Sequence, residues 1–216
     1  MLKLLKYELK DNILPPAIAC ACFIISLILE SDIFMFLSFI ALIVLQILLI
    51  TQTFGANLFG SKGALLLLLP LDLDSLLLAK IVSCLLLICA SYGVIFFSLY
   101  FSGPMPPISV FFTHKTLLFG SYFFTFVLSC ILQIFLTLAL LHLFGITKMK
   151  LAIGLLFFLL LGAISGHINL EPWRYFFTYE TADTFPSMQW NILRYIADSV
   201  IFYFLGRIVI LRKLSL

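Results

Sequence analysis

The chain has 216 residues, of which 63% are hydrophobic and only 11% charged, and its mean hydropathy is +1.21. Soluble domains carry about a quarter of their residues as charges, so this composition excludes a soluble globular enzyme and also a disordered chain. The net charge of +3 is too small to indicate a nucleic-acid partner. Four stretches lack any charged residue, and each is long enough to cross a hydrocarbon core, which takes about 20 residues: 33–61, 81–113, 116–147 and 151–170.

Residues 1–12 predict a short amphipathic helix, because leucines and lysines recur there with helical spacing. The leucines fall on one face and the lysines on the other: Leu2, Leu5 and Leu9 against Lys3, Lys6 and Lys10. A helix of this kind lies in the membrane interface. The alternative is an ordinary charged tail.

Apolar segments of spanning length predict an all-α, polytopic membrane protein with six transmembrane helices in a single domain, 1–216. The last span is the weakest, because Arg194, Asp198 and Arg207 interrupt it, although Asp198 can pair with Arg194 four residues earlier. The six predicted spans cover residues 13–29, 33–56, 75–101, 115–144, 151–165 and 192–211.

Basic residues set the predicted orientation. With both termini in the cytoplasm, ten of the thirteen Lys and Arg residues lie inside, and only Lys115, Arg174 and Arg194 lie outside. The positive-inside rule therefore favours cytoplasmic termini, and an even number of spans agrees with that.

The connection over residues 57–74 is the strongest local signal. It is rich in Gly, Leu, Pro and Asp and is far longer than a tight turn requires. Pro70 ends a leucine helix, and Asp74 is placed to cap the span that follows. We expect a short helix across the cytoplasmic mouth of the protein. The alternative is that Leu65–Leu69 only extend a membrane helix.

The longest outer connection, residues 166–191, is crowded with aromatic side chains. Amphipathic aromatic residues settle at the level of the lipid headgroups. The segment is therefore either an anchor for the last span or an extracellular gate. Its members are Trp173, Tyr175, Phe176, Phe177, Tyr179, Phe185 and Trp190.

No catalytic constellation, phosphate loop or metal-ligand spacing is visible, so no enzyme activity or cofactor is expected of this chain. The five cysteines lie in apolar stretches and are interpreted as small buried hydrophobic residues. Gln46 and Gln133 fall in the middle of spans, where hydrogen bonding between helices is favoured and lining of a transport path is the alternative. No span carries a charge near its middle, which indicates that any transport energy comes from a separate cytoplasmic motor.

Three segments together resemble the pattern of type-2 ABC (ATP-binding cassette) transporter permeases of the bacterial exporter type. Leu4–Lys10 is similar to the amphipathic elbow helix of that family. The stretch Leu58-Phe59-Gly60-Ser61-Lys62-Gly63-Ala64-Leu65, followed by Leu69-Pro70, resembles its first cytoplasmic loop, and Leu76–Lys80 resembles its Leu-Leu-x-x-Lys motif. Lys62 departs from the pattern, because the family usually has an acidic residue there.

The resemblance implies a permease in the bacterial cell membrane that pairs with a second permease copy, or with a similar permease, and with two ATP-binding cassette subunits. Those subunits would bind ATP and Mg²⁺. The loop would hold a coupling helix that docks on them, and the outer aromatic segment would form short helices. The implied cargo is an amphipathic or hydrophobic molecule such as an antimicrobial or toxin peptide. The residues implied in docking are Lys62, Gly63, Leu65, Leu66, Leu67, Pro70, Asp72 and Asp74.

Two other classes stay open. One is the haem-export permeases of cytochrome maturation, which share the size and the loop pattern. The other is a membrane sensor or assembly protein that transports nothing and depends on no ATPase subunit.

Overall fold

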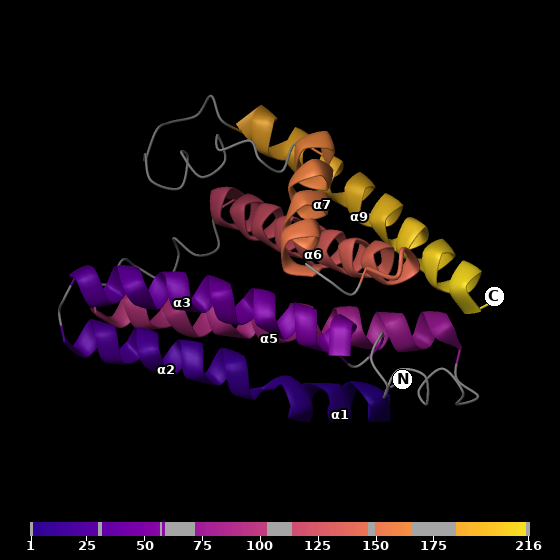
Figure 1. Cartoon of the computed structure of the whole chain (residues 1–216). Coiled ribbons are helices and arrows are strands. Elements are labelled where there is room, and N and C mark those ends of the chain that lie inside the picture. Colours follow the sequence, from indigo (N-terminus) through magenta and orange to yellow (C-terminus); the bar gives the residue numbers. More distant parts are fainter. Residues whose placement is uncertain are drawn as a thin grey trace. The chain divides into compact units, whose positions relative to one another are not determined.

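The computed structural model describes residues 2–29, 32–56, 58, 72–102, 114–146, 150–165 and 185–214, and it is helical in nearly all of them. The all-α prediction is therefore confirmed for the described part of the chain. The chain divides into two compact units, Met1–Pro107 and Ile108–Leu216. Figure 1 shows the helices of the first unit from indigo to magenta and those of the second from red to yellow.

The first unit begins with two helices that meet at a bend of 44°. Helix α1 covers Leu2–Asn12 and α2 covers Leu14–Ile28, with Pro15 and Pro16 in the first turn of α2. Proline fits a first turn because the backbone N–H groups there have no partner within the helix. The two prolines thus allow α2 to begin but prevent α1 from running straight into it.

Three helices of this unit lie side by side (Figure 1): α2, α3 (Asp32–Thr51) and α5 (Leu73–Ser102). The hydroxyl of Ser38 on α3 donates to the carbonyl of Cys22 at 3.3 Å, and the thiol of Cys20 donates to the carbonyl of Ser91 on α5 at 3.8 Å. Ala19, Phe23, Leu42 and Ile95 form a buried apolar core between them. Helix α3 continues into a π-helix, η1 (Gln52–Ala56).

The second unit contains α6 (His114–Leu143), α7 (Lys150–Ser165) and α9 (Phe185–Leu214). Helices α6 and α9 run in the same direction, because Tyr122 near the start of α6 contacts Tyr195 and Phe135 farther along contacts Gly206. Gly145 ends the helical region of α6 with φ of 63°, a left-handed conformation that suits glycine. The amide of Ile146 then donates to the carbonyl of Leu141 and turns the chain towards α7.

Within the described residues, three helices contain apolar windows long enough to cross a membrane: Phe36–Gly55, Leu73–Ile95 and Gly120–Leu143. A fourth span is added if α1 and α2 are taken together as one bent span. Helix α7 offers a shorter apolar stretch, Ile153–Ala163, and α9 carries several charged side chains. The described residues therefore indicate a membrane protein with three or four spanning helices, whereas the six-span topology stays a prediction.

Helix boundaries differ from the predicted ones at two places. Helix α9 begins at Phe185, seven residues before the predicted span, so the end of the predicted outer segment belongs to this helix. Helix α5 begins at Leu73, which places Asp74 inside the first turn and not at the cap. Asp72 directly precedes the helix and its carbonyl accepts the first bond, from the amide of Leu76 at 3.1 Å. The N-cap prediction for Asp74 was therefore wrong, although its charge still suits the positive end of the helix dipole.

Candidate functional site: a buried charge cluster

A buried ion pair joins α1 to α5. The Nζ atom of Lys80 lies 2.6 Å from the Oε1 atom of Glu8, and the side chains of Lys80 and Glu8 are 0% and 10% exposed. Charged groups are tolerated away from water only when they are paired. The pair therefore fixes α1 against α5 at a defined point.

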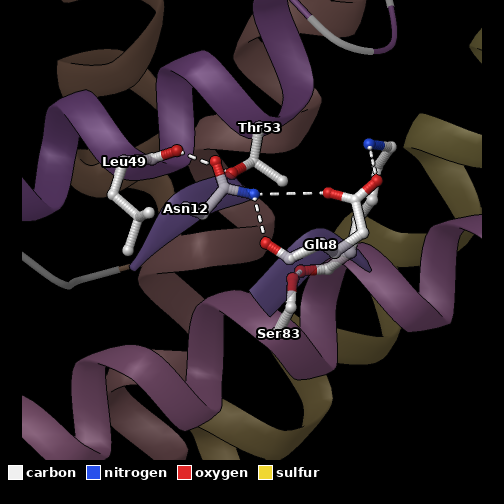
Figure 2. Close-up of polar contacts among 6 residues, drawn as sticks. Glu8, Asn12, Leu49, Thr53 and Ser83 are labelled. Atoms are coloured by element: carbon white, nitrogen blue, oxygen red, sulfur yellow. Dashed lines mark hydrogen bonds and ion pairs between the residues drawn. The ribbon is translucent and has the colours of Figure 1, made fainter. Parts of the chain in front are cut away.

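Asn12, the last residue of α1, holds the same carboxylate from the other side (Figure 2). Its Nδ2 atom donates to the Oε2 atom of Glu8 at 3.3 Å and to the backbone carbonyl of Glu8 at 2.8 Å. Both carboxylate oxygens of Glu8 therefore have a hydrogen-bond donor. Asn12 is itself buried, which makes it part of the cluster and not a surface residue.

Three further buried polar side chains surround the pair. Ser83 donates to the carbonyl of Lys80 at 2.9 Å, and Thr53 of η1 donates to the carbonyl of Leu49 at 2.8 Å (Figure 2). Cys84, one helical turn after Lys80 on α5, is also buried and lies close to Thr53. The cluster (Glu8, Asn12, Thr53, Lys80, Ser83 and Cys84) thus draws together α1, the π-helix and α5. Single π-helical turns occur frequently at functional sites.

The cluster lies within a candidate membrane span. Lys80 is the eighth residue of the window Leu73–Ile95, which places it about 10 Å along the helix axis at 1.5 Å per residue. Ionisable residues inside a membrane segment are rare and mark functional positions more often than structural ones. No three His, Cys, Asp or Glu side chains among the described residues are grouped to hold a metal ion.

Most of the predicted docking residues, from Lys62 to Pro70, fall outside the described residues. Asp72 is exposed and Asp74 is half-buried, and both lie at the start of α5. Their role in docking an ATPase subunit stays a prediction.

Most of the predicted gate residues also fall outside the described residues: Trp173, Tyr175, Phe176 and Tyr179. Trp190 lies on α9 and is 74% exposed. Its placement on the last helix is compatible with an anchor and with a gate alike.

The two mid-span glutamines are both buried. The Nε2 atom of Gln133 donates to the carbonyl of Phe158 on α7 at 2.7 Å, so the favoured interhelical role is confirmed for this residue. The Nε2 atom of Gln46 has no hydrogen-bond partner among the described residues. Lining of a transport path by either residue stays a prediction.

All five cysteines are free thiols. The expectation that they are buried is confirmed for Cys84, but Cys22 is exposed and the other three are half-buried. The apolar setting of a cysteine in the sequence does not tell which side of its helix faces the protein, which is why the expectation failed for Cys22.

The sequence alone placed Glu8 in an interfacial helix and Lys80 at the inner end of a span, without relating them. The sequence does contain one indication that Glu8 faces the protein interior. Leu4, Glu8 and Asn12 recur at every fourth position, so an acid and an amide share a helix face with a leucine. Lys80 is also the last charge before a long uncharged stretch.

Comparison with models of protein families, with curated proteins and with solved structures found no match to this chain.

Proposed function

We propose that this chain is the membrane-spanning permease subunit of an ATP-driven exporter similar to the type-2 ABC transporters. It crosses the bacterial cell membrane six times, with both termini in the cytoplasm. Two permeases form the path, and two separate ATP-binding cassette subunits supply the energy. The cargo is an amphipathic or hydrophobic molecule, with a peptide as the leading class.

The meeting of separate motif segments carries this proposal. Leu4–Lys10 and Leu76–Lys80 were each singled out by resemblance, and the Glu8–Lys80 pair joins them across 72 residues of sequence. The remaining motif segment begins at Leu58. This residue is buried just beyond η1, the π-helix that contributes Thr53 to the same cluster. Chance matches of composition have no reason to converge in space, whereas parts of one coupling apparatus do.

The parallel arrangement of α6 and α9 gives further support. If both helices cross the membrane in the same direction, the chain has to return between them, as spans four, five and six of the proposed topology require. Helix α7 supplies 16 residues of that return, about 24 Å at 1.5 Å per residue. A bilayer accommodates a short span by local thinning at modest cost.

The gene neighbourhood is the first test. A gene for an ATP-binding cassette protein beside this one supports the proposal. Haem-maturation genes there favour the haem-export class instead.

The decisive experiment concerns the predicted docking helix. The double change Leu66→Asp with Leu67→Asp should release the ATP-binding subunit during purification and abolish transport-coupled ATP hydrolysis. The physical reason is that 1.4 kcal/mol already changes affinity about tenfold, and truncating a buried leucine costs about 2–5 kcal/mol.

A matched control places the same two changes at Leu211 and Leu214, near the end of α9 on the same predicted side of the membrane. We expect that control to retain its ATPase partner. If the Leu66/Leu67 variant inserts normally and keeps a fully coupled partner, the docking assignment is wrong and the sensor or assembly class gains.

A further inference from the structure

We propose that the Glu8–Lys80 pair is a latch that holds α1 against both ends of the connection between η1 and α5. In this proposal α1 takes part in the coupling movement and does not serve only as a surface anchor. The latch itself follows from the geometry of the cluster. Only its coupling to nucleotide rests on the proposed function.

The two ends of this connection reach the same cluster. Before the connection, Thr53 of η1 belongs to the cluster. After the connection, α5 contributes Lys80, Ser83 and Cys84 to it. Glu8 and Asn12 supply the contacts from α1, through the ion pair of 2.6 Å and the amide bonds to Glu8. A force on the connection that shifts η1 or α5 must therefore either carry α1 along or open the cluster.

Because the Glu8–Lys80 ion pair is buried, the latch has two stable states, closed and open. Lys80 is fully buried and its ammonium group contacts the Glu8 carboxylate directly. A half-open pair would leave both charges without water and without each other, which is strongly unfavourable. The pair is consequently either closed and dry or fully open and hydrated. Packed elements with two discrete arrangements of this kind transmit small displacements over a distance.

The π-helix η1 is a place where the backbone beside the cluster can change conformation. One residue in an α-helix corresponds to a rotation of about 100°, so conversion of the wide turn of η1 to a regular turn would rotate the residues that follow it. Gly55 lies within η1, and a Cβ atom added there would meet no atom of the described residues within 4 Å. The cluster therefore combines a charge latch with a π-helical turn whose conversion would rotate the neighbouring residues.

The buried thiol of Cys84 reports directly on this latch, because a thiol reacts as the hydrated thiolate. The other four cysteines are replaced by alanine, and the rate of alkylation of Cys84 by N-ethylmaleimide is measured on the purified protein. Glu8→Gln should raise that rate at least about tenfold, the factor that corresponds to 1.4 kcal/mol of cluster opening. The matched control, Lys10→Gln, changes an exposed residue of the same helix and should leave the rate unchanged.

Exchange of the two charges, Glu8→Lys with Lys80→Glu, keeps the ion pair and should restore protection of Cys84. If Glu8→Gln is folded and Cys84 stays protected, the latch is refuted. If Glu8→Gln fails to fold, the exchanged variant decides: protection of Cys84 in a folded protein supports the latch, and misfolding of this variant too overturns it.

The final arm adds the ATP-binding subunit and a non-hydrolysable ATP analogue. A change in the rate of Cys84 alkylation on adding nucleotide supports the coupling role. An unchanged rate, in a complex that hydrolyses ATP normally, shows a static joint and overturns that role. If no ATP-binding subunit associates with the chain, the proposed function fails, while alkylation of the chain alone still decides whether the latch exists.

Discussion

Gly206 of α9 is the position where the smallest change should have the clearest effect. A methyl group added there would overlap the ring of Phe135 on α6, which is 0% exposed. Because Phe135 is buried, its ring can yield only by displacing the side chains packed around it or by moving α6 away from α9. Small residues commonly allow such close approach of membrane helices.

The expected cost of Gly206→Ala follows from two opposing effects. Overpacking of a closely packed site costs about 1–3 kcal/mol. Alanine in a helix interior recovers about 1 kcal/mol relative to glycine. The difference between the two effects is a net loss of up to about 2 kcal/mol in the free energy of unfolding. Unfolding by SDS, followed by circular dichroism in mixed micelles, measures this loss.

Gly120→Ala is the matched control. Gly120 lies in α6, and a Cβ atom added there meets no atom of the described residues within 4 Å. This variant should therefore gain about 0.5–1 kcal/mol from helix propensity alone. The double variant Gly206→Ala with Phe135→Leu should be less destabilised than the two single changes added together, because the smaller side chain makes room. Equal behaviour of Gly206→Ala and Gly120→Ala would refute the close approach of α6 and α9.

The other predictions concern orientation, the outer segment and one interhelical bond. On a background without native cysteines, a cysteine at Ser187 should react with an impermeant reagent in intact cells, and one at Ser61 should not; the opposite pattern would invert the topology. Trp173→Ala and Tyr179→Ala should reduce export while leaving insertion and ATPase binding intact, whereas general destabilisation would favour the anchor. Gln133→Met should lose about 1 kcal/mol of stability through the bond to α7, measured by the same SDS titration, and an unchanged midpoint would show that this bond contributes nothing.

The sequence predicted the helices well, because apolar runs bounded by charges and prolines leave few alternatives in a membrane. The second predicted span, 33–56, matches α3 and η1 together within a residue. The prediction was poorer where a helix begins in polar sequence. Helix α9 starts at Phe185, inside an aromatic stretch whose composition indicated a position at the membrane interface but did not mark where the last helix begins.

The pairing of Glu8 with Lys80 was not predicted from the sequence for a different reason. A charge near a span end is normally explained by snorkelling to the interface, and nothing local distinguishes a lysine that snorkels from one that finds a partner 72 residues away. The π-helical turn that carries Thr53 was equally hidden, because its geometry comes from packing and not from a residue pattern.

The order of Glu8 and Lys80 along the chain has a consequence for biosynthesis. A lysine raises the free energy of insertion of a membrane helix, by about 2.5–3.5 kcal/mol at the centre of the helix, and Lys80 is the eighth residue of the spanning window Leu73–Ile95. Glu8 is translated first, so if α1 lies at the membrane surface as proposed, its carboxylate is available when α5 leaves the ribosome. Lys80 can therefore pair with the Glu8 carboxylate as α5 inserts, and its charge need not stay unpaired in the lipid. A chain shortened from its N-terminus so that Glu8 is lost would lack this partner during insertion, and its yield in the membrane should fall even where the remaining helices pack normally.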